Sequence, residues 1–320
     1  MVNKAIFVFL TGLFLLSSYD PAQASRKVNW GAINPALKGA VSVAKSANPD
    51  DETECLLCHK DYVRAFGRTK HAKAFVSKYG KRLGSACETC HGPMSKHLGG
   101  DTREQRKAAV VSFKSISPAK KNAICLQCHE KGPVMHWRGS SHEMSDVSCD
   151  TCHYVMKKRS KRRLFINDDS KKACFGCHRG KRAKIQRTSH MPLREGKIRC
   201  ASCHNPHGSS GPSLLKRATI NETCYQCHRE KRGPMLFEHA PVRENCANCH
   251  DPHGSNFKQL LKRKAPYLCQ QCHLGVFHVS DVYGGKALAN RSRVIAGKGC
   301  VNCHSQIHGS NHPAGARFQR

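Results

Sequence analysis

Residues 246 to 254 read Cys246-Ala247-Asn248-Cys249-His250-Asp251-Pro252-His253-Gly254. Two cysteines three positions apart, followed at once by a histidine, form the attachment sequence of a c-type haem. The two thiols bind the haem vinyl groups, and the adjacent imidazole binds the iron from one side. Three residues later, a Pro-His-Gly turn offers a second imidazole. This stretch therefore predicts a c-type cytochrome, and the same unit recurs along the whole chain.

The sequence Cys-x-x-Cys-His occurs ten times, and we number these motifs 1 to 10 in chain order. Ten motifs require twenty cysteines, and the chain has 20, so none is left for a disulfide or a reactive thiol. An isolated Cys-x-x-Cys pair would also suit a zinc ribbon or a thiol redox site, but a histidine after every pair favours haem. We therefore predict ten covalently bound c-type haems. Their attachment cysteines are Cys55, Cys58, Cys87, Cys90, Cys125, Cys128, Cys149, Cys152, Cys174, Cys177, Cys200, Cys203, Cys224, Cys227, Cys246, Cys249, Cys269, Cys272, Cys300 and Cys303.

The histidines that end the motifs are the predicted first iron ligands, and nine of the remaining eleven recur at regular offsets as candidate second ligands. The motif histidines are His59, His91, His129, His153, His178, His204, His228, His250, His273 and His304. The candidate second ligands are His71, His97, His142, His190, His207, His239, His253, His278 and His308. Two axial imidazoles give a closed, low-spin iron, which suits electron transfer rather than substrate chemistry.

One position breaks the pattern. After motif 4 the chain reads Tyr154-Val155-Met156, with methionine where motifs 6 and 8 have histidine. We predict Met156 as the sixth ligand of the haem held by His153, which would raise its reduction potential. The alternatives are that His136 or His312 folds in, that this iron is five-coordinate, or that Met156 only fills space against the porphyrin.

The amino-terminal residues predict export. An apolar run from Ala5 to Leu16 follows Lys4 and precedes Ala22-Gln23-Ala24, as in a secretory signal peptide spanning residues 1–24. The run is shorter than the roughly 20 residues that a membrane helix needs. Covalent haem attachment outside the cytoplasm then indicates the periplasm or outer membrane of a Gram-negative bacterium.

The composition limits the fold. Only 39% of the 320 residues are hydrophobic, cysteines included, so the porphyrin faces must supply much of the apolar surface. We expect a multihaem cytochrome c that is mostly coil, with short α-helices wrapped around a quasi-linear array of ten haems and little or no β-structure. The formal net charge of +32 is partly offset by haem propionates. Because the chain carries an export signal, the remaining basicity favours a solvated face or an acidic redox partner over nucleic acid.

The motifs fall into five pairs, which indicates an internal repeat and an extended array. We expect an extended lead-in over residues 25–54. Short helices are predicted to begin ahead of the first motif of a pair, at Ser117-Pro118, Asp169, Asn221 and Ala265-Pro266.

Several stretches resemble a known family. They are the order of the ten motifs, Trp137 to His142 (WRGSSH), Ser189-His190, Lys231 to Pro241 (KRGPMLFEHAP), and the ending from Cys300 to Pro313 (CVNCHSQIHGSNHP). Together they are similar to the periplasmic decahaem cytochromes of outer-membrane porin–cytochrome conduits, the Mtr, Mto, Pio and Dms-type group. The resemblance runs from Cys55 to the C-terminus. Met156 departs from it, since metal-reducing members carry histidine there.

The resemblance implies a haem wire inside an outer-membrane β-barrel porin, fed by periplasmic cytochromes and ending at an extracellular cytochrome or at Fe(II)/Fe(III) minerals. It also implies two pentahaem halves, residues 55–198 and 199–320. Such a protein is an electron carrier rather than an enzyme, and Met156 with the basicity slightly favours Fe(II) oxidation over metal reduction. The alternatives are a soluble periplasmic shuttle and, less favoured, a multihaem oxyanion reductase with an open iron at His153.

Overall fold

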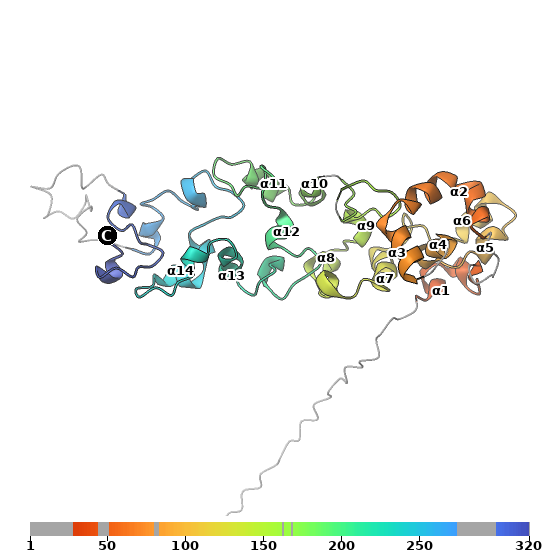
Figure 1. The fold of residues 1–320 in the computed structure, drawn as a ribbon, viewed down its shortest axis with the longest axis horizontal. Helices are drawn as coiled ribbons and strands as arrows, with labels where there is room; N and C mark the ends of the chain where they lie inside the picture. Colours follow the sequence, from red (N-terminus) through yellow and green to blue (C-terminus); the bar gives the residue numbers. More distant parts are fainter. Residues whose placement is uncertain are drawn as a thin grey trace, which may run out of the picture.

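The computed structural model describes residues 28–43, 51–79, 83–161, 163–167, 169–273 and 299–319. The predicted signal peptide and His278 lie outside these residues. Within them, no helix has the length and apolarity needed to cross a membrane. The chain forms an elongated body in which motif 1 lies near one end and motif 10 near the other (Figure 1).

Most of the longer helices gather at the amino-terminal end (Figure 1). The three long ones are α2 (Asp51–Gly67), α3 (Lys70–Tyr79) and α4 (Leu83–His91), and the short α5 (Ser95–Leu98) and α6 (Arg103–Ala108) follow them. Motif 1 is part of α2, which is kinked at His59, and motif 2 ends α4. Phe66, Ala72 and Ala86 bring α2, α3 and α4 together in a small apolar cluster.

From motif 3 onward the helices are short and loops connect them. The α-helices are α7 (Pro118–Leu126), α8 (Ser141–Met144), α9 (Cys149–Cys152), α10 (Ser170–Phe175), α11 (Arg179–Ile185), α12 (Cys200–Cys203), α13 (Ile220–Tyr225) and α14 (Ala240–Glu244). The 3₁₀ turns are η3 (Gly132–Val134), η4 (Pro212–Leu214), η5 (Arg229–Lys231), η6 (Cys246–Asn248), η7 (Lys258–Leu260), η8 (Cys269–Gln271), η9 (Cys300–Asn302) and η10 (Gly315–Arg317). Each motif thus sits on at most one or two helical turns.

The described residues form isolated β-bridges but no strand. Short helices and coil therefore dominate, which confirms the predicted fold class. Three of the bridges repeat the same local design, because each joins a motif histidine to a residue 11 or 12 positions later. They pair His153 with Phe165, His204 with Leu215 and His250 with Leu261. The repeat predicted from the motif spacing is thus also a repeat of backbone geometry.

The lead-in is not extended where the structure describes it, which corrects the sequence-based expectation. Residues 28–43 contain α1 (Trp30–Ile33) and the 3₁₀ turn η1 (Pro35–Leu37). Ile33 and Leu37 are buried in a cluster with Val111 and Ile124. The prolines were a misleading signal, because Pro35 occupies the first position of a helical turn, where its missing N–H costs nothing.

Two of the four predicted helix starts are confirmed and two are wrong. No helix begins at Ala265-Pro266, where the chain forms a turn over residues 265–268 ahead of η8. Ser117 caps α7 by accepting a hydrogen bond from the Lys120 N–H, and Asp169 caps α10. Asn221 instead lies inside α13, and Thr219 is the cap. Both Asn221 and Thr219 are good capping residues, so residue type alone could not choose between them.

Candidate haem-binding centres

Consecutive motifs are neighbours in space along the chain. Within a pair the first cysteines approach each other. The Cys125 thiol donates a hydrogen bond to the Cys149 sulfur, and this hydrogen bond together with burial raises the pKa of Cys125. Between pairs the second cysteines approach: burial and then the charge of Cys128 raise the pKa of Cys90 to about 11. The same proximity recurs, as a hydrogen bond or as a charge interaction, at Cys55–Cys87, Cys152–Cys177, Cys174–Cys200, Cys203–Cys227, Cys224–Cys246, Cys249–Cys272 and Cys269–Cys300. The motifs therefore follow one another in order from 1 to 10, which the sequence alone did not establish.

Seven motif histidines each face a second imidazole at nearly the same distance. Their ring centroids lie between 5.9 and 6.2 Å apart. The pairs are His59–His97, His71–His129, His142–His178, His153–His207, His204–His253, His239–His273 and His250–His308.

This distance fits one iron between the two rings of a pair. With a metal–nitrogen bond of about 2.0 Å and about 1.1 Å from nitrogen to ring centroid, two imidazoles on one metal have centroids about 6.2 Å apart. Two packed histidine rings in van der Waals contact would have no reason to repeat that spacing seven times. The residues present therefore fit a bis-histidine haem iron at these seven positions.

The orientation of many of these rings is fixed by the backbone. In nine histidines, Nδ1 lies 2.5–2.9 Å from a backbone carbonyl oxygen, which assigns the proton to Nδ1 and leaves the Nε2 lone pair for a metal. These histidines are His91, His97, His142, His153, His190, His204, His239, His250 and His304. Metal-binding histidines ordinarily use this second contact to hold tautomer and ring plane.

The carbonyls that hold three motif histidines come from residues with unusual backbone angles. In each case the histidine Nδ1 forms a hydrogen bond with a backbone carbonyl. The pairs are His153 with Arg163, His204 with Ser213 and His250 with Gln259, and the φ angles of Arg163, Ser213 and Gln259 are 55°, 51° and 54°. Left-handed backbone costs about 1–2 kcal/mol for a non-glycine residue. The same strained turn recurs after motifs 4, 6 and 8, so its position next to an iron ligand is part of the repeat.

The pairing connects different modules. After motifs 6, 8 and 10, the following histidine faces the motif two places earlier: His207 faces motif 4, His253 faces motif 6, and His308 faces motif 8. After odd motifs the direction reverses. His71, His142 and His239, which follow motifs 1, 3 and 7, face motifs 3, 5 and 9.

The pairing around His153 corrects one sequence-based prediction. His207 lies opposite His153, with ring centroids 6.0 Å apart and planes within 17°. Burial, followed by the charge of His153, lowers the pKa of His207 to about 4, so this imidazole is neutral as a metal ligand must be. Met156, His136 and His312 are therefore not needed at this haem. Met156 packs instead against Phe66 and its neighbours in the α2–α4 cluster.

The remaining histidines outside the motifs do not face a motif histidine in the described structure. His190 and His228 line the same cavity, but the Nε2 of His190 lies 3.0 Å from Glu195 Oε1, and no ring pairing with His228 is formed. The module pattern predicts this pair. His278, the candidate partner of His304, lies outside the described residues. His136 and His312 are exposed.

A continuous cavity of about 3930 Å³ joins the facing rings. It is lined by the motif histidines of motifs 3 to 10 and by the second histidines that face them. Pockets for single ligands are ordinarily about 300–1000 Å³, so this cavity suits a row of large planar groups. When bound, covalent haems there would supply one-electron redox chemistry.

Comparison with known proteins agrees with this arrangement. A family model described as "Doubled CXXCH motif" matches residues 190–233 and 239–276, and one described as "Cytochrome c554 and c-prime" matches residues 94–154. The "Multiheme cytochrome MtrA" of Shewanella baltica (strain OS185) is 41% identical over 278 residues, covering 85% of this chain and 82% of the relative. The chain belongs to the MtrA family of multihaem cytochromes. It is therefore an electron-transfer cytochrome with covalently attached c-type haems.

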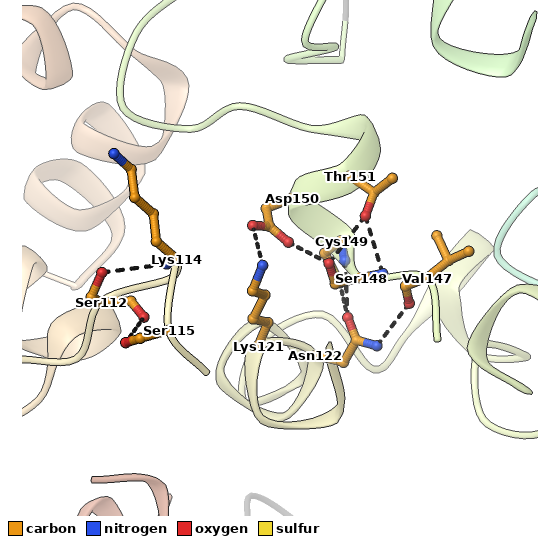
Figure 2. A network of polar contacts seen from close by, with 10 residues as sticks. All are labelled: Ser112, Lys114, Ser115, Lys121, Asn122, Val147, Ser148, Cys149, Asp150 and Thr151. Atoms are coloured by element: carbon orange, nitrogen blue, oxygen red, sulfur yellow. Dashed lines mark hydrogen bonds and ion pairs between the residues drawn. The ribbon is translucent and has the colours of Figure 1, made fainter. Parts of the chain in front are cut away.

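In this MtrA-family chain, a buried asparagine three residues before the first motif of a pair joins the two motifs. Asn122 of α7 accepts a hydrogen bond from the Cys149 N–H at 2.9 Å and donates one to the Val147 carbonyl at 3.1 Å (Figure 2). Beside it, Lys121 and Asp150 form an ion pair at 3.0 Å. Asn221 makes the same type of contacts to Cys246 and Val242. Sequence analysis missed this role, although the repeated Asn-x-x-Cys spacing was a usable signal.

Replacing Asn122 with alanine should lower the free energy of unfolding by about 1–3 kcal/mol, because the partly buried Cys149 N–H and Val147 carbonyl lose the buried side chain that pairs with both. The measurement is chemical denaturation of the purified holoprotein, followed by far-UV circular dichroism. Ser115→Ala is the control, since its hydroxyl makes only an exposed hydrogen bond to the Ser112 carbonyl. Equal stabilities of the two variants would contradict the asparagine clamp.

Proposed function

We propose that this MtrA-family cytochrome carries ten haems and conducts electrons across the outer membrane inside a β-barrel porin. The observation that carries the proposal is the unbroken order of motifs from one end of an elongated molecule to the other. A freely diffusing carrier needs only one or two exposed haems, whereas a wire needs a row that reaches from end to end. The similarity to a multihaem cytochrome supports electron transfer as the underlying activity.

The proposed ligand set contains the ten motif histidines and the nine histidines predicted from the sequence. The nine second histidines would close nine of the ten irons, so that the protein spaces these haems and excludes substrates from their metals. The oxyanion-reductase alternative depended on an open iron at His153, and His207 removes its basis. Electron transfer is then the remaining chemistry.

We propose that the protein is exported to the periplasm by its amino-terminal signal and receives or delivers electrons there through periplasmic cytochromes. Beyond the membrane it would exchange electrons with an extracellular cytochrome or with iron, with Fe(II) oxidation slightly favoured over metal reduction. The basic run from Lys157 to Arg163 supports steering of an acidic partner. Its Lys157, Lys158 and Arg159 are exposed, and the Arg159 guanidinium lies 3.7 Å from the centroid of the Tyr154 ring.

Sealed liposomes test the conduit. The holoprotein and its candidate barrel are reconstituted around a trapped redox dye, and Fe(II) or an oxidant is added outside. We expect the dye to respond only when both proteins are present, and the couple that responds reports on direction. Liposomes with the barrel alone and with the cytochrome alone are the controls. A silent dye, with barrel insertion and haem loading verified, would favour the soluble periplasmic shuttle instead.

A further inference from the structure

The loops that follow the even-numbered motifs pack in one constant register. The loop after motif 6 places Gly208 against the backbone carbonyl of His136, which follows motif 3. The loop after motif 8 places Gly254 against the carbonyl of Lys184, which follows motif 5. After motif 10, Ser310 forms a β-bridge with Phe237, which follows motif 7. Each of these loops therefore lies on the segment that follows the motif three places earlier.

The loop after motif 4 continues this register. Its Met156 packs against the cluster formed by Phe66, Ala72 and Ala86, of which Phe66 and Ala72 follow motif 1. Motif 1 is three places before motif 4, as the pattern requires. The loop that carries Met156 is thus placed as its counterparts are, even though its sequence lacks the His-Gly that all three of them contain.

This packing pattern also predicts which motif residue 156 should face. In the counterparts, the residue three positions after the motif histidine faces the motif two places earlier, as His207 faces motif 4 and His253 faces motif 6. Met156 stands three positions after His153. The corresponding motif is motif 2, whose histidine is His91. Ala86, which directly precedes this motif on α4, belongs to the cluster that Met156 contacts.

The ring of His91 is held in an orientation that suits iron binding. Among the residues that the structure describes, no imidazole lies opposite it. Its Nδ1 lies 2.8 Å from the Val111 carbonyl oxygen, which leaves Nε2 for the metal. Its ring contacts that of Phe113, with centroids 5.8 Å apart. The two unassigned histidines belong to other parts of the molecule, since His136 lies beside Gly208 and His312 binds Ser310 near motif 10.

We propose that the thioether sulfur of Met156 is the sixth ligand of the haem attached at motif 2, opposite His91. The chain then contains one His/Met haem at the second position of the array. Methionine ligation raises the reduction potential, so this haem holds electrons more strongly than the bis-histidine haems on either side. Met156 packs against the apolar cluster of Phe66, Ala72 and Ala86, surroundings that suit a thioether.

This inference rests on the proposed haem assignments and not on the membrane conduit, so its test is spectroscopic. Near-infrared magnetic circular dichroism of the ferric wild-type holoprotein should show a thioether-to-iron charge-transfer band with the intensity of one haem in ten. Met156→His should abolish that band and move one of the ten reduction steps to lower potential. Met144→His is the control, because Met144 is 80% exposed, and it should retain the band. A wild-type protein without the band, or a Met156→His variant that keeps it, overturns the proposal.

Two matched variants locate the ligand. Removing the attachment cysteines of motif 2 (Cys87→Ala with Cys90→Ala) should eliminate the thioether band, whereas removing those of motif 4 (Cys149→Ala with Cys152→Ala) should leave it. The opposite result would assign Met156 to His153 and overturn the proposal. If either variant does not fold with nine haems by mass spectrometry, an experimental structure of the wild-type holoprotein gives the same decision. Density from Met156 to the iron of His91 supports the proposal, and density to any other iron contradicts it.

Discussion

Replacing His207 with alanine should convert one closed, low-spin haem into an open one that binds carbon monoxide after reduction, where the wild type binds none. The reason is the pairing with His153, whose ring is 6.0 Å away and nearly parallel. His207 is set in a turn whose backbone alanine can adopt, so the loop should remain seated. Its Nδ1 is buried without a hydrogen-bond partner, so the substitution removes no such bond at Nδ1. The effect is therefore expected at the iron rather than in the fold.

Carbon monoxide difference spectra, calibrated against total haem, measure the change as one binding site in ten haems. His136→Ala is the matched control, because His136 is exposed and lies beside Gly208, in contact with the same loop. It should bind no carbon monoxide. If His207→Ala stays closed to carbon monoxide with all haems attached, the assignment of His207 as a ligand is wrong.

Local features of this chain could be predicted from its sequence because short-range chemistry determines them. Cys-x-x-Cys-His specifies covalent haem attachment whatever its surroundings, and Ser117-Pro118 specifies a helix start because cap and proline act within one turn. The high share of coil followed from the small number of apolar residues available per haem. For these features, residue type and spacing were sufficient.

The features that required the structure involve residues far apart in the chain. His207 serves His153 from 54 positions away, two motifs along the array, although Met156 is nearer in sequence and has a suitable donor atom. Proximity in sequence favoured Met156 as the ligand, but the way the loops pack on earlier segments places His207 opposite His153. Likewise, the carbonyl of Gln259 reaches His250 because the φ angle of Gln259 is 54°. Glutamine rarely adopts this conformation, so the residue type does not predict it.

The register itself depends on glycine, so Gly254→Ala should be strongly damaging. Gly254 has φ +134°, a region that is essentially restricted to glycine, and an added Cβ would overlap the carbonyl oxygen of Lys184. The backbone strain costs about 1–3 kcal/mol, and the forced displacement about 1–3 kcal/mol more. The total is a large part of the roughly 5–15 kcal/mol by which a domain is stable.

The damage should extend to the neighbouring contacts, because the same loop is fixed at two further points. Ser255 exchanges two backbone hydrogen bonds with Ser189, at 3.0 and 2.7 Å, and Asp251 pairs with the Lys184 ammonium at 2.5 Å. Moving the loop off α11 would break these contacts and withdraw His253 from His204. We therefore expect a lower denaturation midpoint and, in part of the population, carbon monoxide binding at the haem of motif 6.

Gly139→Ala separates the two causes of this effect. Gly139 also has positive φ, at +75°, but a Cβ there would have nothing within 4 Å. It should lose only the strain component, about 1–2 kcal/mol, and should bind no carbon monoxide. If both glycine variants lost the same stability, backbone strain alone would explain the result and close loop packing would not be needed. A larger loss at Gly254, together with carbon monoxide binding, would show that the contact between modules holds the second ligand in place.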